Sequence, residues 1–231
     1  MRINIHAGHN PDGKVACGAI GLIKESTAAR GVVKLLIPLL QKAGHTVFDC
    51  TVDNGTSQSD VLNKIIRKCN SNVVDLDISI HFNAGAKDLI GNGQTTGVEV
   101  LVYDKSDFIT TYANKVCDNI ANLGYKNRGV KVRQDLGYLK GVAAPAMLIE
   151  CCFVDDMDDV KLYSAETMAK AISQAIIESV GAEEKRYNKI SELPDWAKPT
   201  IEKLVKDGKI SDGNNLGMTL DMVRVLIIMN R

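Results

Sequence analysis

Apolar positions follow two different periods along the first 181 residues. Short runs rich in β-branched residues predict strands at residues 2–6, 45–51, 73–84, 98–103, 130–132 and 146–150. Longer segments, whose apolar residues return every three or four positions, predict helices at residues 25–43, 57–70, 106–123 and 164–180. Because strands and helices alternate, the sequence predicts an α/β fold with a twisted, mostly parallel sheet and helices on both faces.

The segment 73–84 is the most informative of the predicted strands. Its sequence, VVDLDISIHFNA, is apolar enough for a strand buried inside a parallel sheet, and it carries His81 near its carboxyl end. Ligands of open α/β sheets bind just beyond the carboxyl ends of the strands. We therefore expect His81 to take part in chemistry. The alternative is a histidine that only fills a hydrogen-bonded place in the core.

Three further polar residues, His9, Glu25 and Glu150, are expected at the same edge of the sheet. His9 follows the first strand directly after Gly8, whose freedom allows a sharp turn, and Glu25 opens the first helix. Two imidazoles and one carboxylate can hold zinc and leave one coordination position open. The sequence thus predicts a zinc site formed by His9, Glu25 and His81. An ordinary first-turn acid is the alternative for Glu25.

Glu150 ends the apolar run AMLI, where an unpaired carboxylate is costly to bury. We expect Glu150 to act as a general base beside the metal, the alternative being an ion pair with an Arg or Lys. His6 competes with His9 as a ligand, but Gly8 favours His9, and we assign His6 a supporting or structural role. His45 is expected to be a turn residue away from the site.

The composition changes after Gly181. Residues 182–189 are charged and predict a linker, and residues 190–231 predict a small helical C-terminal domain with helices at 196–208 and 219–231, the second capped by Thr219. A unit of this size cannot bury all the apolar residues of its last helix alone. We expect this domain to dock on a partner, most simply a second copy of the chain.

The overall composition excludes several classes of function. The chain has 28 basic and 28 acidic residues, which mix along it to a formal net charge of +0, so no basic surface for nucleic acid or an anionic membrane is expected. No apolar run is long enough to span a bilayer, and the first residues do not resemble a signal peptide. The six cysteines, without C-x-x-C spacing, favour reduced structural thiols.

Six segments in order carry a resemblance to a known family. They are GHNPDG with His9, the helix-opening Glu25, ISIHFNA with His81, GVEV at 97–100, NRGVK at 127–131, and PAMLIECCF with Glu150. Together they resemble the zinc-dependent N-acetylmuramoyl-L-alanine amidases of the amidase-3 type over residues 1–181, in particular those of bacteriophage endolysins active on clostridial cell walls. The chain departs from the family's pattern at His6, where an acid is common, and at Cys151 and Cys152, which replace a glycine.

The resemblance implies a peptidoglycan hydrolase that cleaves the amide between N-acetylmuramic acid and L-alanine. It implies one Zn²⁺ per chain, held by His9, Glu25 and His81, with Glu150 as catalytic acid and base. Asn83, two positions after His81 on the same face of the strand, is expected to contact the substrate. The tail resembles half of a surface-layer-homology-like unit, which implies wall attachment or dimerisation. We expect the protein to be made in the cytoplasm and to act on the wall after release.

Two other functions are compatible with the sequence. A non-catalytic wall-binding or scaffolding protein would keep the fold and lose the chemistry, although the complete set of candidate ligands speaks against it. A cysteine peptidase would use Cys17 or Cys151 with His81, but neither cysteine stands beside a group that would lower its thiol pKa.

Overall fold

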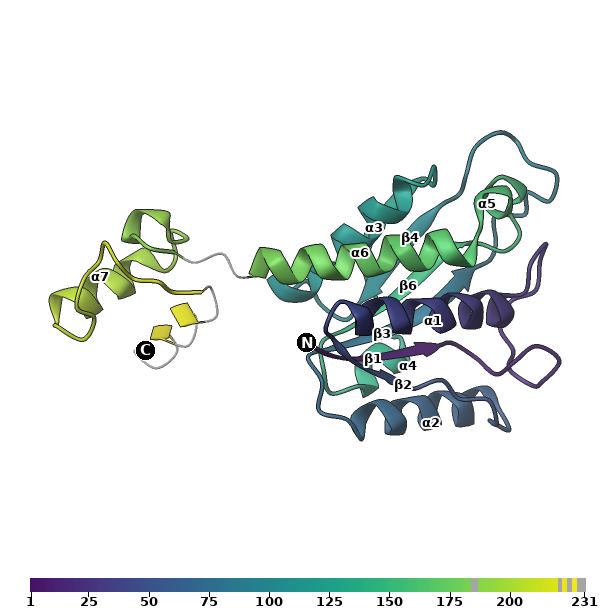
Figure 1. Ribbon diagram of the computed structural model, residues 1–231. Helices are drawn as coiled ribbons and strands as arrows, with labels where there is room; N and C mark the ends of the chain where they lie inside the picture. Colours follow the sequence, from purple (N-terminus) through teal and green to yellow (C-terminus); the bar gives the residue numbers. More distant parts are fainter. Residues whose placement is uncertain (184–186, 220–221, 224–225, 228–231) are drawn as a thin grey trace. The chain divides into compact units, whose positions relative to one another are not determined.

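The computed structural model describes residues 1–183, 187–219, 222–223 and 226–227, and a mixed sheet of six strands lies at the centre of its larger unit, residues 1–177 (Figure 1). The strands are β1 (Arg2–Ala7), β2 (Thr46–Asp49), β3 (Leu76–Asn83), β4 (Val98–Val102), β5 (Asn127–Val132) and β6 (Ala146–Phe153). The helices of the same unit are α1 (Glu25–Lys42), α2 (Gln58–Asn70), α3 (Asp107–Ala121), α4 (Gly137–Gly141), α5 (Met157–Leu162) and α6 (Ala165–Glu183).

The strand order is β2-β1-β3-β6-β4-β5. Strands β1, β2, β3 and β6 are parallel to one another, whereas β4 pairs antiparallel with β6 and parallel with β5. The predicted class, α/β with a mostly parallel sheet, is confirmed. Reversal of β4 has a local consequence, because it sets Glu99 opposite Glu150, and Glu150 in turn lies opposite His81.

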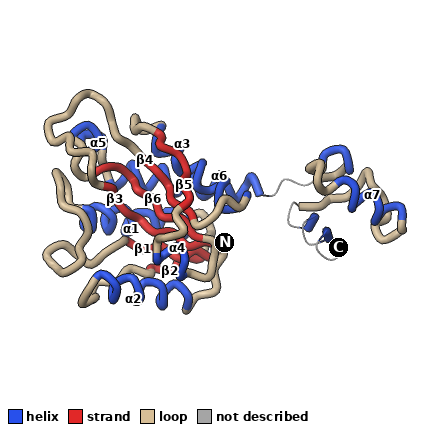
Figure 2. Tube along the Cα trace, turned by 180° about the vertical axis from the view of Figure 1, so that it is seen from behind, coloured by secondary structure: helices blue, strands red, loops and turns tan. Residues whose placement is uncertain are grey.

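One face of the sheet is covered by α1, α3 and α6, and the other by α2 and α4. Figure 1 shows α1 and α6 in front of the strands, and Figure 2, seen from behind, shows α2 and α4 on the opposite side. Ala146 and Leu148 of β6 belong to the apolar cluster with α2 and α4, so Met147 and Ile149 point to the other face, as alternate positions on a strand must. The helices therefore lie on both faces, as the sequence predicts.

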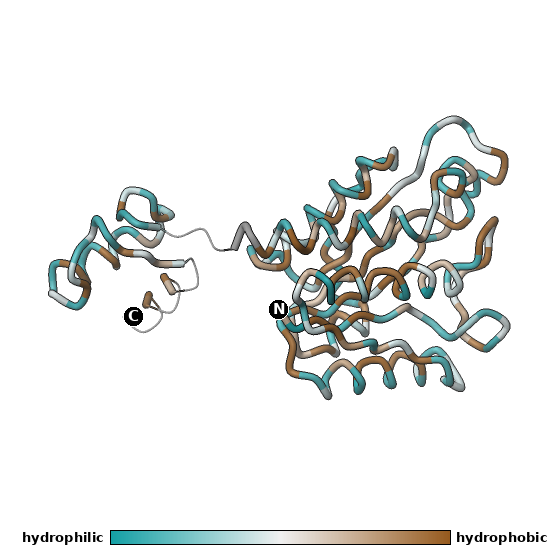
Figure 3. The backbone as a smooth tube through the Cα atoms, viewed as in Figure 1, coloured by the Kyte–Doolittle hydropathy of each residue, from teal (hydrophilic) through white to brown (hydrophobic). Residues whose placement is uncertain are grey.

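Local signals explain where several elements begin. Ser57 caps α2, since its side chain accepts a hydrogen bond from the Asp60 backbone N–H. Buried residues at every fourth position, Val61, Ile65 and Cys69, face the sheet from this helix. Figure 3 shows hydrophobic and hydrophilic positions alternating along α2. Helix α1 begins at Glu25, where the sequence predicts it.

The predicted strand at 73–84 is too long at its amino end. Strand β3 starts at Leu76, and Val73 is 84% exposed. Arg2 holds this approach segment through bonds to the Val73 carbonyl and the Asp75 carboxylate, outside the packed layers. Helices α4 and α5 are not expected from the sequence, because five and six residues are too few to display a helical period.

The chain divides into two compact units, 1–177 and 178–231. In the second unit, the short 3₁₀ turn Ile190–Glu192 and α7 (Lys198–Lys206) pack around a small apolar cluster that includes Leu204, Val223 and Ile227. Met222 is 51% exposed, and its backbone N–H donates to Thr219 Oγ1 at 3.4 Å, as expected for a cap. Residues 220–221, 224–225 and 228–231 of the predicted last helix, and 184–186 of the predicted linker, lie outside the described residues.

No described helix combines the length and apolarity needed to cross a bilayer. All six cysteines are free, and five of them are buried.

Candidate metal centre and active site

His9, Glu25 and His81 meet at the carboxyl edge of the sheet. Glu25 Oε1 lies 2.9 Å from His81 Nδ1 and 3.2 Å from His9 Nε2. One ligand atom from each residue falls within 4.8 Å of the others, which is close enough for all three to bind a single ion. The loop after β1, the start of α1 and the end of β3 thus deliver the three residues that the sequence singles out. His45, by contrast, lies beside the amino terminus, 3.3 Å from the Met1 nitrogen.

The Glu25 carboxylate is fixed by the backbone on both sides. Its Oε2 accepts a bond from the Ala19 N–H at 2.7 Å, and its Oε1 accepts one from the Phe82 N–H at 3.3 Å. Burial alone would raise the pKa of Glu25, but the hydrogen bonds from His81 and His9 outweigh burial and hold this pKa well below its usual range. Glu25 is therefore ionised, as a metal ligand must be.

Two glycines leave room for the imidazoles. A Cβ on Gly8 would come within 2.1 Å of His81 Cε1, and a Cβ on Gly18 would come within 2.5 Å of Glu25 Oε2. The left-handed turn that the sequence places on Gly8 falls instead on His9, with φ 64°. Gly8 is thus needed because the His81 ring packs against the backbone. His9 bears the backbone strain, which is typical of functional sites.

Glu150 lies next to this cluster, and one of its carboxyl oxygens makes no hydrogen bond to the described residues. It pairs with His81 across β3 and β6, and its buried Oε2 has no hydrogen-bond partner within the described chain. Burial, reinforced by the charges of Glu25 and Glu99 and opposed by Arg133, raises the pKa of Glu150 to about 8. The ion pair considered as an alternative for Glu150 is not formed among the described residues. A carboxyl group that can hold or release a proton near neutral pH is suited to general acid and base work.

Glu99 is the site residue that sequence reasoning missed. It is buried and accepts bonds from Arg128 Nε at 2.7 Å, from Asn83 Nδ2 at 3.1 Å and from Lys131 Nζ. An acid in the middle of the apolar run Val98–Val102 is the signal that could have found it, because a buried carboxylate needs partners. Asn83 does reach the site, but it already donates to Glu99 and accepts from the Ala84 N–H.

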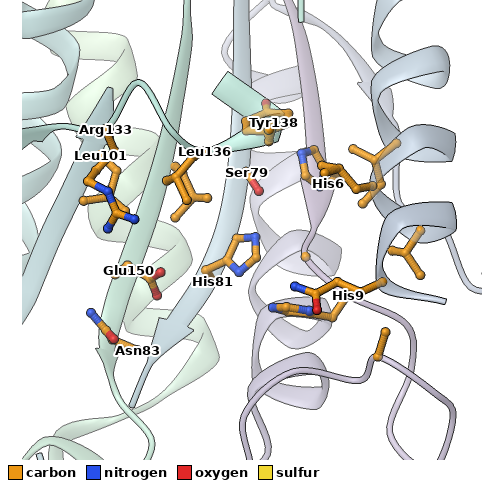
Figure 4. Close-up of a pocket in the computed structure, with 18 of the residues that line it drawn as sticks. His6, His9, Ser79, His81, Asn83, Leu101, Arg133, Leu136, Tyr138 and Glu150 are labelled. Atoms are coloured by element: carbon orange, nitrogen blue, oxygen red, sulfur yellow. The ribbon is translucent and has the colours of Figure 1, made fainter. Parts of the chain in front are cut away.

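A pocket of about 360 Å³ opens beside these residues, between the sheet and helices α2 and α4. Figure 4 shows His81 between Glu150 on one side and His9 on the other. His6 is buried deeper, where its ring meets the Tyr138 ring edge-on at 4.8 Å and its Nδ1 approaches the Ala7 carbonyl. The structure thus separates His6 from the three candidate ligands.

The thiols next to Glu150 do not face this pocket. Cys151 and Cys152 are fully buried, and burial raises the pKa of both thiols well above the usual value. A thiol that resists ionisation is a poor nucleophile. Cys151 is therefore unsuited to the peptidase chemistry considered as an alternative.

The residues present fit a catalytic zinc ion. Two imidazoles and an ionised carboxylate form the donor set, and the glycines leave the space that the ligand side chains need. Three protein ligands leave one position for water, and Glu150 lies beside them.

Comparison with known proteins identifies the family. The sequence profile of the family described as N-acetylmuramoyl-L-alanine amidase (Amidase_3) matches residues 3–182. The chain belongs to this amidase family. The resemblance noted in the sequence is confirmed, and the matched residues include all four candidate site residues as well as Asn83.

Two curated relatives show how far the similarity extends. An uncharacterized protein of Clostridium perfringens strain 13 is 34% identical over 182 residues, which are 77% of this chain and 52% of that protein. The endolysin of Bacillus phage SPP1 is 27% identical over 188 residues, which are 76% of this chain and 63% of the endolysin. The chain thus spans about half the length of the first relative and less than two thirds of the second.

Solved amidase structures share the fold. The catalytic domain of the CD27L endolysin targeting Clostridia Difficile superposes with a TM-score of 0.68 at 28% identity, covering 77% of this chain and 97% of that domain. The N-acetylmuramoyl-L-alanine amidase AmiC2 of Nostoc punctiforme superposes with a TM-score of 0.64 over 78% of this chain and 97% of that one, at 22% identity. This second likeness supports the fold alone.

Proposed function

We propose that the protein is a zinc-dependent peptidoglycan amidase that hydrolyses the bond between N-acetylmuramic acid and L-alanine. One observation carries this proposal: the cluster of His9, Glu25 and His81 lies beside Glu150, whose buried Oε2 has no partner within the described chain. Family membership supports the reaction class, and the donor set supports zinc.

His9, Glu25 and His81 would hold the ion, and each is positioned by contacts of its own. The ion, when bound, supplies a Lewis acid for the scissile carbonyl and lowers the pKa of a water molecule. Glu150 accepts the proton of the attacking water at Oε2 and later donates a proton to the departing amine. Its raised pKa suits both steps, because the free energy of the two protonation states is similar near neutral pH.

Glu99 keeps the surrounding cations away from Glu150. Arg128 and Lys131 both bind the Glu99 carboxylate, so neither neutralises the catalytic acid. The negative charge of Glu99 also helps to raise the pKa of Glu150. Asn83 lines the same pocket and remains a proposed substrate contact, although binding substrate requires it to share or exchange its bond to Glu99.

The proposal also covers the cellular role of the protein and the roles of its two domains. We infer an endolysin-like or autolysin-like role in which residues 1–181 form the catalytic domain, residues 182–189 a linker, and residues 190–231 attach to the wall or dimerise. Similarity to the phage SPP1 endolysin supports this role. Synthesis in the cytoplasm and action after release follow from it as expectations.

Digestion of purified cell wall tests the reaction. We expect new N-terminal alanine to appear without new reducing sugar ends, because an amidase leaves the glycan intact. Treatment with a metal chelator should abolish the release, and added zinc should restore it. New reducing ends in place of N-terminal alanine, or full activity in the chelator, would refute the proposal.

A further inference from the structure

The pocket beside the metal cluster has two chemically different ends. At one end, under β1 and β3, lie His6, Ser79 and Tyr138; at the other, beside β4 and β5, lies Arg133. Figure 4 shows Arg133 and Glu150 on one side of His81 and His6 on the opposite side. A substrate that fills the pocket therefore meets different chemistry at its two ends.

The His6 end is polar but uncharged. His6 Nε2, Ser79 Oγ and the Tyr138 hydroxyl are buried without hydrogen-bond partners in the described chain. Burial, followed by the repulsion of His81, lowers the pKa of His6 to about 3, so its ring is neutral near pH 7. A carboxylate placed there would lose its water without meeting a cation, which is costly.

The other end offers a cation with donors to spare. Arg133 is the only Arg or Lys that lines this pocket among the described residues. Its Nε and Nη2 each donate to the Asp135 carboxylate at 2.8 Å, which holds the guanidinium plane in place. Nη1 has no hydrogen-bond partner among the residues that the structure describes, and the side chain remains 45% exposed. A guanidinium anchored in this way is suited to binding a second carboxylate.

The proposed reaction decides which part of the substrate reaches Arg133. Glu150 donates its proton to the departing amine, so the peptide on that amine extends on the Glu150 side of the metal cluster. Strand β6, which carries Glu150, is followed in the sheet by β4 and β5, and Arg133 comes directly after β5. The peptide that begins with L-alanine, called the stem peptide, thus runs toward Arg133, and the sugar lies on the opposite side.

The distances are compatible with the second residue of the stem. Arg133 N donates to the Val102 carbonyl, and Val102 pairs with Met147, three residues before Glu150 along β6. The backbones of Arg133 and Glu150 are therefore offset by roughly 10 Å along the strands and by two strand spacings, again roughly 10 Å, across the sheet. When the second residue of the peptide is linked onward through its side chain, its α-carboxylate stays free and lies about two residue lengths, roughly 7 Å, from the departing nitrogen. The long side chain of Arg133, which lines the same pocket as Glu150, spans the remainder.

We propose that Arg133 binds the α-carboxylate of the residue that follows L-alanine in the stem peptide, and that it makes the enzyme prefer a free carboxylate to a carboxamide at that position. This inference rests on the proposed amidase function, because the reaction sets the direction of the peptide. It assigns Arg133 a role in specificity, separate from the chemistry of Glu150.

Calorimetric binding to the zinc-loaded Glu150→Gln variant tests this proposal without turnover. The two ligands are N-acetylmuramoyl-L-alanyl-D-glutamine, which has a free α-carboxylate, and the same molecule with an α-carboxamide. We expect the first to bind about tenfold more tightly, as for a charge-assisted hydrogen bond. Adding Arg133→Gln should reduce this ratio to near one, and adding Arg133→Lys should leave a ratio of about three, because the charge remains but the planar fork is lost.

Arg67→Gln is the matched control, because Arg67 is an exposed arginine of α2 that does not line the pocket. It should keep the tenfold ratio. The assignment would be overturned if Arg133→Gln left the ratio of the two affinities unchanged. It would also be overturned if the protein with Arg133 in place bound the carboxylate and the carboxamide equally well. Failure of the amidase proposal looks different, since the wild-type protein would then release no N-terminal alanine from cell wall.

Discussion

The two faces of the sheet differ in whether they carry buried polar atoms without hydrogen-bond partners. On the face covered by α1, α3 and α6, strand residues such as Ile5, Ile80 and Ile149 are completely buried and apolar. On the face covered by α2 and α4, the neighbouring positions carry His6, Ser79, His81 and Glu150, and several of their polar atoms have no described partner. Adjacent residues of one strand thus have different roles: one packs in the apolar core, and the next belongs to the candidate site.

The comparison teaches how one sheet combines stability with chemistry. Complete burial of aliphatic side chains stabilises the fold, whereas buried polar atoms without partners cost free energy. A site whose groups must bind metal, protons and substrate has to keep them unpaired, and the packed face offsets the cost. The predictions that follow separate the two contributions.

The largest effect is expected at Glu150. Glu150→Gln should lower kcat for wall hydrolysis about 10³-fold, because the amide cannot accept the proton of the attacking water. Zinc content and the free energy of unfolding should not fall, since glutamine removes a carboxyl group that is costly to bury. Product release assays and urea denaturation measure the two quantities. A variant with more than a tenth of wild-type activity would contradict this role.

Neighbouring residues of β3 allow a direct comparison of the faces. Ile80→Ala should lower the free energy of unfolding by about 3 kcal/mol, because it leaves a cavity in the packed face. Ser79→Ala, one position earlier, should cost less than about 1 kcal/mol, because the lost hydroxyl has no described partner. Urea titration of the metal-free variants gives both values. The contrast fails if Ser79→Ala proves the more destabilising.

Replacing Gly8 should weaken zinc binding more than it destabilises the fold. In Gly8→Ala the new Cβ would displace the His81 ring, and we expect a 10- to 100-fold loss of zinc affinity, as for other changes that disturb a ligand's support. Gly31→Ala in α1 is the control, since its Cβ would meet only an ordinary contact at 3.4 Å. Competition titration with a zinc chelator measures both. Equal affinities in the two variants would argue against this function of Gly8.

The last prediction concerns pH. The folded-state pKa of His6, about 3, lies below the usual histidine value of 6.5, so between these pH values the unfolded chain binds the proton that the folded chain excludes. The contribution of His6 to stability is therefore lost as pH falls below 6.5, by about 1.4 kcal/mol per pH unit. In chelator, His6→Gln should show a shallower decline than the wild type. Parallel declines would mean that His6 is not buried neutral.

Much of the fold and the metal cluster could be predicted because the signals are local. The start of α1 at Glu25, and His81 at the end of an apolar run, follow from short patterns, and parallel strands bring such ends to one edge. The sequence favours His9 over His6 as a ligand, but for a different reason from the one that the structure shows. The sequence attributes the turn to Gly8, whereas the positive φ belongs to His9 and Gly8 accommodates His81.

The missed features depend on contacts between distant segments. Glu99 faces Glu150 only because β4 runs antiparallel to β6, and its cations come from β5. No pattern within residues 98–102 reveals that pairing. Val73 shows the converse: it continues an apolar run, yet the sheet begins three residues later, and an apolar run alone does not show where pairing starts.

Zinc binding tests the central claim most directly. Titration of the metal-free wild type with zinc should give one site per chain, and His9→Ala, Glu25→Ala and His81→Ala should each lose it, while Glu150→Gln and His6→Gln keep it. Undiminished binding in any of the three ligand variants, or loss of the site in His6→Gln with the fold intact, would show that the metal is held elsewhere.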